Sequence, residues 1–183
     1  STFGDNPRAY FRQTSYRLED ERMAVVVQTL GGCRRGNYFY PTFSGVAQSH
    51  NFYPISYMKP EDGVAQIALG LGRTVVEGGP IVRFCPRYPM LLPQFADMRD
   101  WLYFTQKRFY ALDMDPIREP RDPVTMDRLR PLPLSVAESQ WVLQKVASVY
   151  QSDSGLLVDS FFYAGPRIVP FQKVLRVPRL NFG

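Results

Sequence analysis

Two short glycine-containing stretches could bring main-chain amides close to an anion. The first is Thr42-Phe43-Ser44-Gly45-Val46-Ala47, and the second runs from Gly70-Leu71-Gly72 to Gly78-Gly79. Glycine has no side chain, so backbone N–H groups at such positions can approach phosphate oxygens closely. Neither stretch has the spacing of a Rossmann fingerprint or a Walker loop. Taken alone, each is better explained as an ordinary turn or bulge.

The other residues that commonly carry chemistry are isolated in the sequence. The single histidine, His50, excludes a multi-histidine metal site and leaves only one possible centre for a catalytic triad. Two cysteines, Cys33 and Cys85, exclude a disulfide-dense scaffold and a four-cysteine zinc site. We expect His50 to be structural or on the surface, and the cysteines to be unpaired.

Three charged pairs have both an ordinary and a functional interpretation. Glu61-Asp62 precedes a glycine and is expected in a solvated turn rather than in acid–base work. Asp113 and Asp115 would project to one side of a strand end, where a polar strand terminus is favoured over a cation site. Arg34-Arg35 could contact phosphate, but a solvated loop is favoured.

Composition limits the class of protein. The chain has 183 residues, of which 45% are hydrophobic, enough for one packed domain. It lacks an apolar stretch of about 18 residues, which excludes a spanning helix. The 22 basic and 17 acidic residues give a net charge of +5, but the charge is spread along the chain, and a nucleic-acid partner is not favoured. The start at Ser1, with no targeting segment, suggests a piece of a longer cytoplasmic protein.

Short strands with few helices should position these residues. The apolar runs predict strands at 23–28, 38–49 (broken near Pro41 and Gly45), 63–69, 81–85, 107–114, 143–150, 156–162 and 168–171. Helices are expected at 8–14, 95–104, 134–139 and 172–176, and a long surface loop at 115–133. Several connections are too short for crossover helices, so we expect an α+β fold with a mixed, mainly antiparallel sheet.

Taken together and in order, several motifs resemble a known family. They are Met23-Ala24-Val25-Val26-Val27-Gln28, Ser44-Gly45-Val46-Ala47, Ala68-Leu69-Gly70-Leu71-Gly72 and Val75-Val76-Glu77-Gly78. This string resembles the ATP-binding region of the phosphoenolpyruvate synthase and pyruvate phosphate dikinase family. The resemblance covers about residues 23–79, and it implies that residues 1–183 are a single fragment, a partial ATP-grasp-like domain.

The resemblance also implies a site and a reaction. Gln28, Thr29 and Leu30 match the linker along which adenine lies, and Ser44-Gly45-Val46 matches a turn whose amides face the phosphates. In that family ATP, with Mg²⁺ as cofactor, phosphorylates a histidine on a separate domain. A third domain then passes the phosphoryl group to pyruvate. The implied partners are therefore ATP and the phosphohistidine and pyruvate-binding domains of a longer parent chain, with no membrane.

The departures from the family pattern are equally specific. Arg73 stands where the family usually has Glu, and an arginine cannot ligate Mg²⁺, although it could pair with a phosphate. An upstream phosphate-binding lysine and a downstream acidic strand with Leu-Gln-x-Arg are missing. Gln106-Lys107-Arg108 resembles the last segment only superficially and is not assigned to it. No catalytic or metal-ligating residue is therefore assigned.

The leading hypothesis is the ATP-binding region of a phosphotransferase of this type, inactive as an isolated fragment. The alternative is a degenerate ATP-grasp module that binds a partner or a polyanion without catalysis. A sibling dikinase acting on another acceptor, such as a glucan or an antibiotic, also remains open. The sequence does not determine the acceptor or the oligomeric state.

Overall fold

The computed structural model describes residues 24–92, 94–95, 97–120 and 127–176. The chain divides into two units, Ser1–Leu30 and Gly31–Gly183. In the first unit, residues 24–30 form neither helix nor strand, and all of them are exposed. The predicted strand at 23–28 is therefore wrong over its described residues, because a β-branched run becomes a strand only when neighbouring strands or a core pack against it. Met23 and the predicted helix at 8–14 lie outside the described residues.

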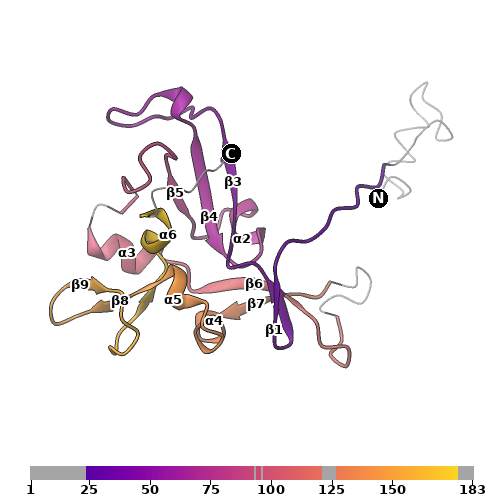
Figure 1. The fold of residues 1–183 in the computed structure, drawn as a ribbon. Coiled ribbons are helices and arrows are strands. Elements are labelled where there is room, and N and C mark those ends of the chain that lie inside the picture. The colour runs from indigo at the N-terminus through magenta and orange to yellow at the C-terminus, as the bar shows by residue number, and fades with distance from the viewer. Residues whose placement is uncertain (1–23, 93, 96, 121–126, 177–183) are drawn as a thin grey trace, which may run out of the picture. The chain divides into compact units, whose positions relative to one another are not determined.

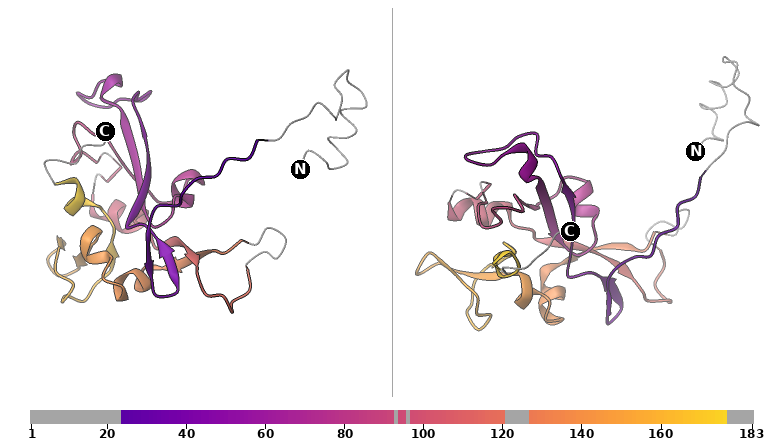
Figure 2. Two further views of the ribbon diagram at one scale, coloured as in Figure 1. Left: turned by 45° about the vertical axis from the view of Figure 1, so that its right-hand side comes forward. Right: turned by 45° about the horizontal axis from the view of Figure 1, so that its top comes forward.

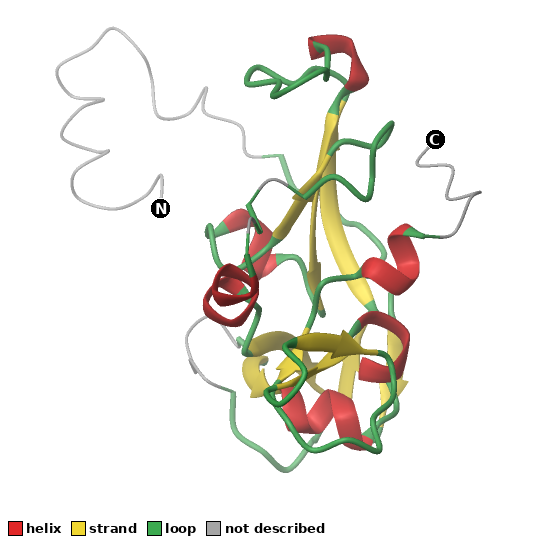
Figure 3. Ribbon diagram, turned by 90° about the vertical axis from the view of Figure 1, so that its left-hand side faces the viewer, coloured by secondary structure: helices red, strands yellow, loops and turns green. Residues whose placement is uncertain are grey.

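The described part of the second unit contains three sheets, in which every pairing between strands is antiparallel (Figure 1). With its short helices, the unit has the α+β class and the mainly antiparallel pairing that the sequence predicts. Figure 3 shows how the helices are distributed around the strands. None of the helices in the described part of the chain has the length and apolar character needed to cross a membrane.

One sheet has the order β3-β4-β5, with β3 at Phe43–Gln48, β4 at Val64–Leu69 and β5 at Val82–Phe84. Strands β3 and β4 lie side by side over their whole length in both views of Figure 2. The predicted break at Pro41 is confirmed, but the break at Gly45 is wrong. Gly45 pairs with Ile67 inside the ladder, and a Cβ atom there would lie 2.4 Å from the carbonyl oxygen of Gln66. This glycine therefore permits a close approach of two strands.

The four-stranded sheet has the order β1-β2-β6-β7, with its strands at Cys33–Arg35, Tyr38–Tyr40, Arg108–Asp113 and Leu129–Pro133. Strand β6 confirms the prediction at 107–114. Strand β7 corrects the expected loop at 115–133, of which residues 121–126 lie outside the described residues. A proline has no backbone N–H to donate to a neighbouring strand. Pro131 and Pro133 are tolerated because β7 is an edge strand.

The third sheet has the order β10-β8-β9, with β8 at Ser148–Gln151, β9 at Leu156–Val158 and β10 at Arg167–Ile168. The predicted hairpin between β8 and β9 is confirmed, although β9 is shorter than expected. The predicted strand at 143–150 is half wrong, because α5 occupies Leu143–Val146. This single helical turn buries the side chains at both of its ends, Leu143 and Val146. Of the predicted strand at 168–171, only Ile168 lies in a strand, and Phe171 has φ +56° and is the N-cap of the next helix.

Short helices complete the second unit: η2 at Pro60–Asp62, α2 at Arg73–Val76, α3 at Met98–Phe104, α4 at Leu134–Ser139 and α6 at Gln172–Leu175. Helix α4 is confirmed to its bounds. Helix α3 begins after Asp97, whose carboxylate accepts hydrogen bonds from the amides of Arg99 and Asp100. The core joins β4, β5 and β6 to α5 and α6 through buried apolar side chains, including Leu69, Phe84, Phe109, Leu143 and Phe171.

Candidate functional site

The Gly-Leu-Gly segment connects two of the sheets. Gly70 pairs with Tyr110 of β6 in a parallel bridge, and the amide of Leu71 donates to the carbonyl of Tyr110 at 2.8 Å. Gly70 has φ +80°, and a Cβ atom there would lie 2.7 Å from the oxygen of Tyr110. The first glycine of this motif is therefore required by the crossing itself, before any ligand is considered.

The predicted phosphate-facing residues lie beside this crossing. The hydroxyl of Ser44 donates to the carbonyl of Gly70 at 2.7 Å. Ser44-Gly45-Val46 forms part of β3 rather than the expected turn, so its local conformation corrects the prediction. Because β3 is the outer strand of its sheet, alternate backbone groups face away from β4. Amides in this stretch are therefore displayed along a strand edge.

Arg73 begins α2 directly after the glycines. Its Nε atom donates to Glu77 Oε1 at 2.7 Å, and its Nη1 atom lies 3.9 Å from Asp127 Oδ2. Its guanidinium lies 5.2 Å from the centre of the Tyr110 ring. The hydrogen bond to Glu77 raises the pKa of Arg73 above its ordinary value. The positive charge at this position is thus shared with two carboxylates.

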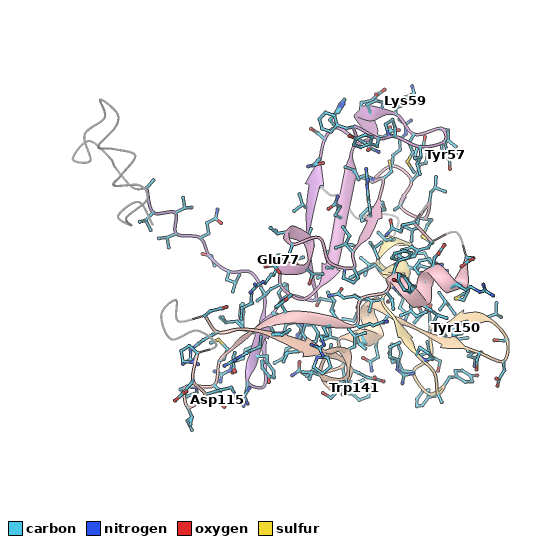
Figure 4. The ribbon with its side chains drawn as sticks, turned by 180° about the vertical axis from the view of Figure 1, so that it is seen from behind. Tyr57, Lys59, Glu77, Asp115, Trp141 and Tyr150 are labelled. Carbon is cyan, nitrogen blue, oxygen red and sulfur yellow. The ribbon has the colours of Figure 1, made fainter. Side chains whose placement is uncertain are left out.

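A groove of about 810 Å³ opens next to Arg73. We call it the α2–β6 groove, and it is lined by Thr74, Glu77, Gly78, Gly79, Pro80, Tyr103, Phe104, Thr105, Lys107, Arg108 and Tyr110. These residues come from α2 and the glycines after it, from the end of α3 and from β6. Figure 4 labels Glu77 at α2, where the β3-β4-β5 sheet meets β6. The volume is in the range of small-molecule and cofactor sites, about 300–1,000 Å³.

The charges along the groove favour an anion. Lys107 and Arg108 are exposed, and neither cationic group has a hydrogen-bond or ion-pair partner within the part of the chain that the structure describes. The one acidic lining residue, Glu77, is already paired with Arg73. Exposed arginine and lysine side chains that are not already paired are suitable for contacting phosphate oxygens.

Aromatic side chains lie beside these cations. Tyr103 is 75% exposed and Phe104 49% exposed, and their ring centres are 4.9 Å apart in an edge-to-face arrangement. Exposed rings of this kind offer a face on which a planar heterocycle can stack. Cations and aromatic rings together suit a ligand with both an anionic and an aromatic part.

Gln106 fixes the strand that carries the two cations. Its side-chain oxygen accepts from the amide of Leu69 at 2.8 Å, and its nitrogen donates to the carbonyls of Leu69 at 3.0 Å and Arg108 at 2.9 Å. The side chain is buried, and its amide group makes the pair of hydrogen bonds to Leu69 that the backbone of a neighbouring strand would otherwise make. The groove roles of Lys107 and Arg108 were missed from the sequence. The available sequence signal was two adjacent cations, Lys107 and Arg108, at the start of a predicted strand.

The structure brings together only part of the predicted site. Ser44 and Arg73 flank the Gly70–Gly72 crossing, and Arg73 contacts Glu77 and Tyr110 of the groove. None of the predicted binding residues lines the groove itself. Gln28, Thr29 and Leu30 belong to the first unit, where each is exposed. Their suggested role beside adenine stays a prediction.

The remaining candidates have ordinary surroundings. His50 is exposed and packs edge-to-face with Phe52, and both cysteines are free, as expected. Asp113 is buried and paired with Arg118 and Arg130 rather than facing a cation site.

Mg²⁺ has no evident ligand set within the described residues. Across residues 24–92, 94–95, 97–120 and 127–176, no three His, Cys, Asp or Glu side chains are grouped so that they could hold a metal ion. The donors at the groove are cationic, which fits phosphate and does not fit a metal.

Comparison with known proteins leaves the chemistry of the site to be inferred from its geometry. No protein-family model, curated protein or solved structure matches the chain.

Proposed function

We propose that this chain is the ATP-binding region of a phosphotransferase that resembles phosphoenolpyruvate synthase and pyruvate phosphate dikinase. It would then be a partial ATP-grasp domain. The rest of a longer cytoplasmic parent would carry the phosphorylated histidine and the pyruvate site. The proposal starts from the ordered motifs Ser44-Gly45-Val46-Ala47 and Gly70-Leu71-Gly72 and gains support from the site geometry.

One observation carries the proposal. The Gly-Leu-Gly crossing that holds Ser44 against Gly70 leads directly into α2, and α2 forms one wall of the α2–β6 groove. Ser44 and Gly70 are 26 residues apart in the sequence, a separation that by itself requires no contact between them. Their association next to a nucleotide-sized groove is what an ATP site needs.

The residues of the groove have clear roles in this proposal. Lys107 and Arg108 would neutralise phosphate charge, and Tyr103 or Phe104 would offer a stacking surface. Phosphoryl transfer depends mainly on positioning and on the neutralisation of spread negative charge. Because the described donors do not fit Mg²⁺, the metal ligands would have to come from outside the described residues, and we derive no catalytic step for this chain alone.

A second candidate is a degenerate module that binds a polyanion without catalysis. The ion pair between Arg73 and Glu77 favours it, because the arginine that replaces the usual acidic residue already has a carboxylate partner. The same two groove cations would serve a polyanion equally well. The two candidates differ in whether an adenine base contributes to binding.

Calorimetry with ATP and with inorganic triphosphate tests the proposal. The 183-residue chain should bind ATP more tightly than triphosphate, without turnover. The double variant Lys107→Gln/Arg108→Gln should weaken ATP binding at least about tenfold, as expected for the loss of charge-assisted hydrogen bonds. The double variant Lys145→Gln/Arg99→Gln is a matched control, since both residues are exposed and lie outside the groove.

The outcomes separate the two candidates. Equal affinity for ATP and triphosphate would favour the polyanion module. ATP binding that survives the groove variant would remove the α2–β6 groove as the site. ATP turnover by the chain alone would show that catalytic groups have been overlooked.

A further inference from the structure

A second, smaller pocket lies beside β5 and shares no lining residue with the α2–β6 groove. We call it the β5 pocket. It has a volume of about 260 Å³ and lies under the connection from β3 to β4, which carries Tyr57 and Lys59 at the far end of the hairpin (Figure 4). Nothing in the proposed ATP function uses it.

The walls of the pocket are largely apolar and well packed. Met58, Val64 and Phe84 are buried, and the more exposed Ile55 also lines it. A hollow of about 260 Å³ that is partly lined by these apolar side chains has room for a small apolar group.

Asn51 supplies an amide group to the lining of the pocket. Its side chain is buried, with only 4% of the residue exposed. Its Oδ1 atom accepts from the amide of Tyr53 and from Arg83 Nη2, both at 3.1 Å. Since two N–H groups meet this atom, it must be the oxygen, and the side chain also carries its amide nitrogen Nδ2, a hydrogen-bond donor, in the lining of the pocket.

Arg83 supplies an unpaired positive charge. Its guanidinium donates to Asn51 Oδ1, and no carboxylate within the described residues pairs with it. Gln94 holds its backbone in place by accepting from the amide of Arg83 at 3.3 Å and donating to the carbonyl of Ile81 at 3.1 Å. No residue that lines the pocket is acidic. The polar side of the pocket is therefore rich in donors and carries one net positive charge.

We propose that the β5 pocket binds a small organic monocarboxylate, with its carboxylate on Arg83 and the Asn51 amide and its short apolar tail against Met58, Val64 and Phe84. A carboxylate matches the planar guanidinium fork. One cation balances one negative charge, and the apolar walls disfavour a strongly hydrated dianion. The volume, just below the usual range for drug-sized ligands, limits the tail to a few carbon atoms.

Calorimetry with three probes tests this site on the 183-residue chain. 3-Methylbutanoate carries the proposed chemistry, 3-methylbutanamide has the same shape without the charge, and inorganic phosphate has charge without the tail. We expect the carboxylate to bind at least about tenfold more tightly than either control, since a hydrogen-bonded ion pair contributes more than a neutral contact. Bound carboxylate should also slow alkylation of Cys85, which lines the pocket, and leave the exposed Cys33 unaffected.

Two variants and one control locate the binding. Arg83→Gln should weaken carboxylate binding at least about tenfold. Ile55→Trp should also weaken it, because a larger side chain at the pocket would occupy the space and leave Arg83 intact. Arg34→Gln, which also removes an arginine from a short strand, should leave the affinity for the carboxylate unchanged.

Several results would overturn the proposal. These are no binding of the carboxylate, equal binding of the amide or of phosphate, or full affinity in Arg83→Gln. If Arg83→Gln does not fold, Ile55→Trp decides, and unchanged affinity in that variant would reject the pocket. ATP binding at the α2–β6 groove is measured independently, so failure of one site leaves the other unaffected.

Discussion

The hydroxyl of Ser44 and the carbonyl of Gly70 form a 2.7 Å hydrogen bond between the middle of one motif and the start of the next. Ser44 lies in β3, and Gly70 lies where the chain leaves β4 to cross β6. This bond helps to hold the Gly-Leu-Gly segment in position, and through it the start of α2. Any ligand in the α2–β6 groove depends on that position.

Ser44→Ala should lower the free energy of unfolding by about 1 kcal/mol, the usual net value of one hydrogen bond. The effect is local to the crossing, so the sheet should remain intact. Thermal or denaturant unfolding measures the change. Ser49→Ala is the control, because Ser49 is exposed just beyond β3 and should change stability by less than about 0.5 kcal/mol. Equal effects in both variants would argue against the Ser44–Gly70 bond.

Gly70→Ala should destabilise the chain much more than Gly78→Ala. Both glycines have similar left-handed backbones, with φ +80° and +76°, but only Gly70 has an atom close to the new Cβ position, the Tyr110 oxygen at 2.7 Å. We expect a loss of about 3 kcal/mol or more at Gly70, from strain plus overlap, and about 1 kcal/mol at Gly78 from strain alone. Denaturant unfolding distinguishes them. Similar losses would mean that the crossing relaxes freely.

Gln106→Ala should lower the free energy of unfolding by about 3 kcal/mol, because the buried amide and carbonyl of Leu69 and the part-buried carbonyl of Arg108 lose their partner. The variant should also weaken ligand binding in the α2–β6 groove, since Gln106 fixes the strand that carries Lys107. The exposed Gln48→Ala is a matched control. Equal stability in Gln106→Ala would show that water replaces the amide without cost.

The loop before β4 should loosen in acid through Asp62. The amide of Lys59, which donates to Asp62 Oδ2 at 2.8 Å, and next the side chain of Arg87, lower the pKa of Asp62 below its ordinary value. A depressed carboxyl pKa contributes stability above the unfolded pKa of about 4, and that stability is lost as the pH falls through the lower folded value. Hydrogen-exchange protection of the Lys59 amide should therefore decrease below about pH 4.

Asp62→Asn should remove this pH dependence and reduce protection of the same amide at neutral pH. Glu61→Gln is the control, because Glu61 is exposed and adjacent in sequence. Protection that follows the same pH curve in Asp62→Asn as in the unmodified chain would reject Asp62 as the titrating group.

Local sequence patterns were sufficient to predict an element where its own residues carry a clear apolar run, alternation or helical turn. The apolar run that forms β4, the alternation in β6 and the helical turn at Leu134–Ser139 all identified elements that the structure contains. The run Val25-Val26-Val27 has equally strong strand propensity, yet it remains exposed and unpaired among the described residues. Propensity is realised as a strand only when another strand supplies hydrogen bonds.

The sequence by itself determined the α+β class and most of the main strands, because these depend on the spacing of apolar positions along the chain. Only the tertiary structure decided which of these positions meet. It placed Lys107 and Arg108 beside the same groove as α2, made Gln106 a buried bridge, and gave Arg83 no carboxylate partner among the residues that the structure describes. Such relationships join residues that are dozens of positions apart, and long-range packing, which no local pattern encodes, brings them together.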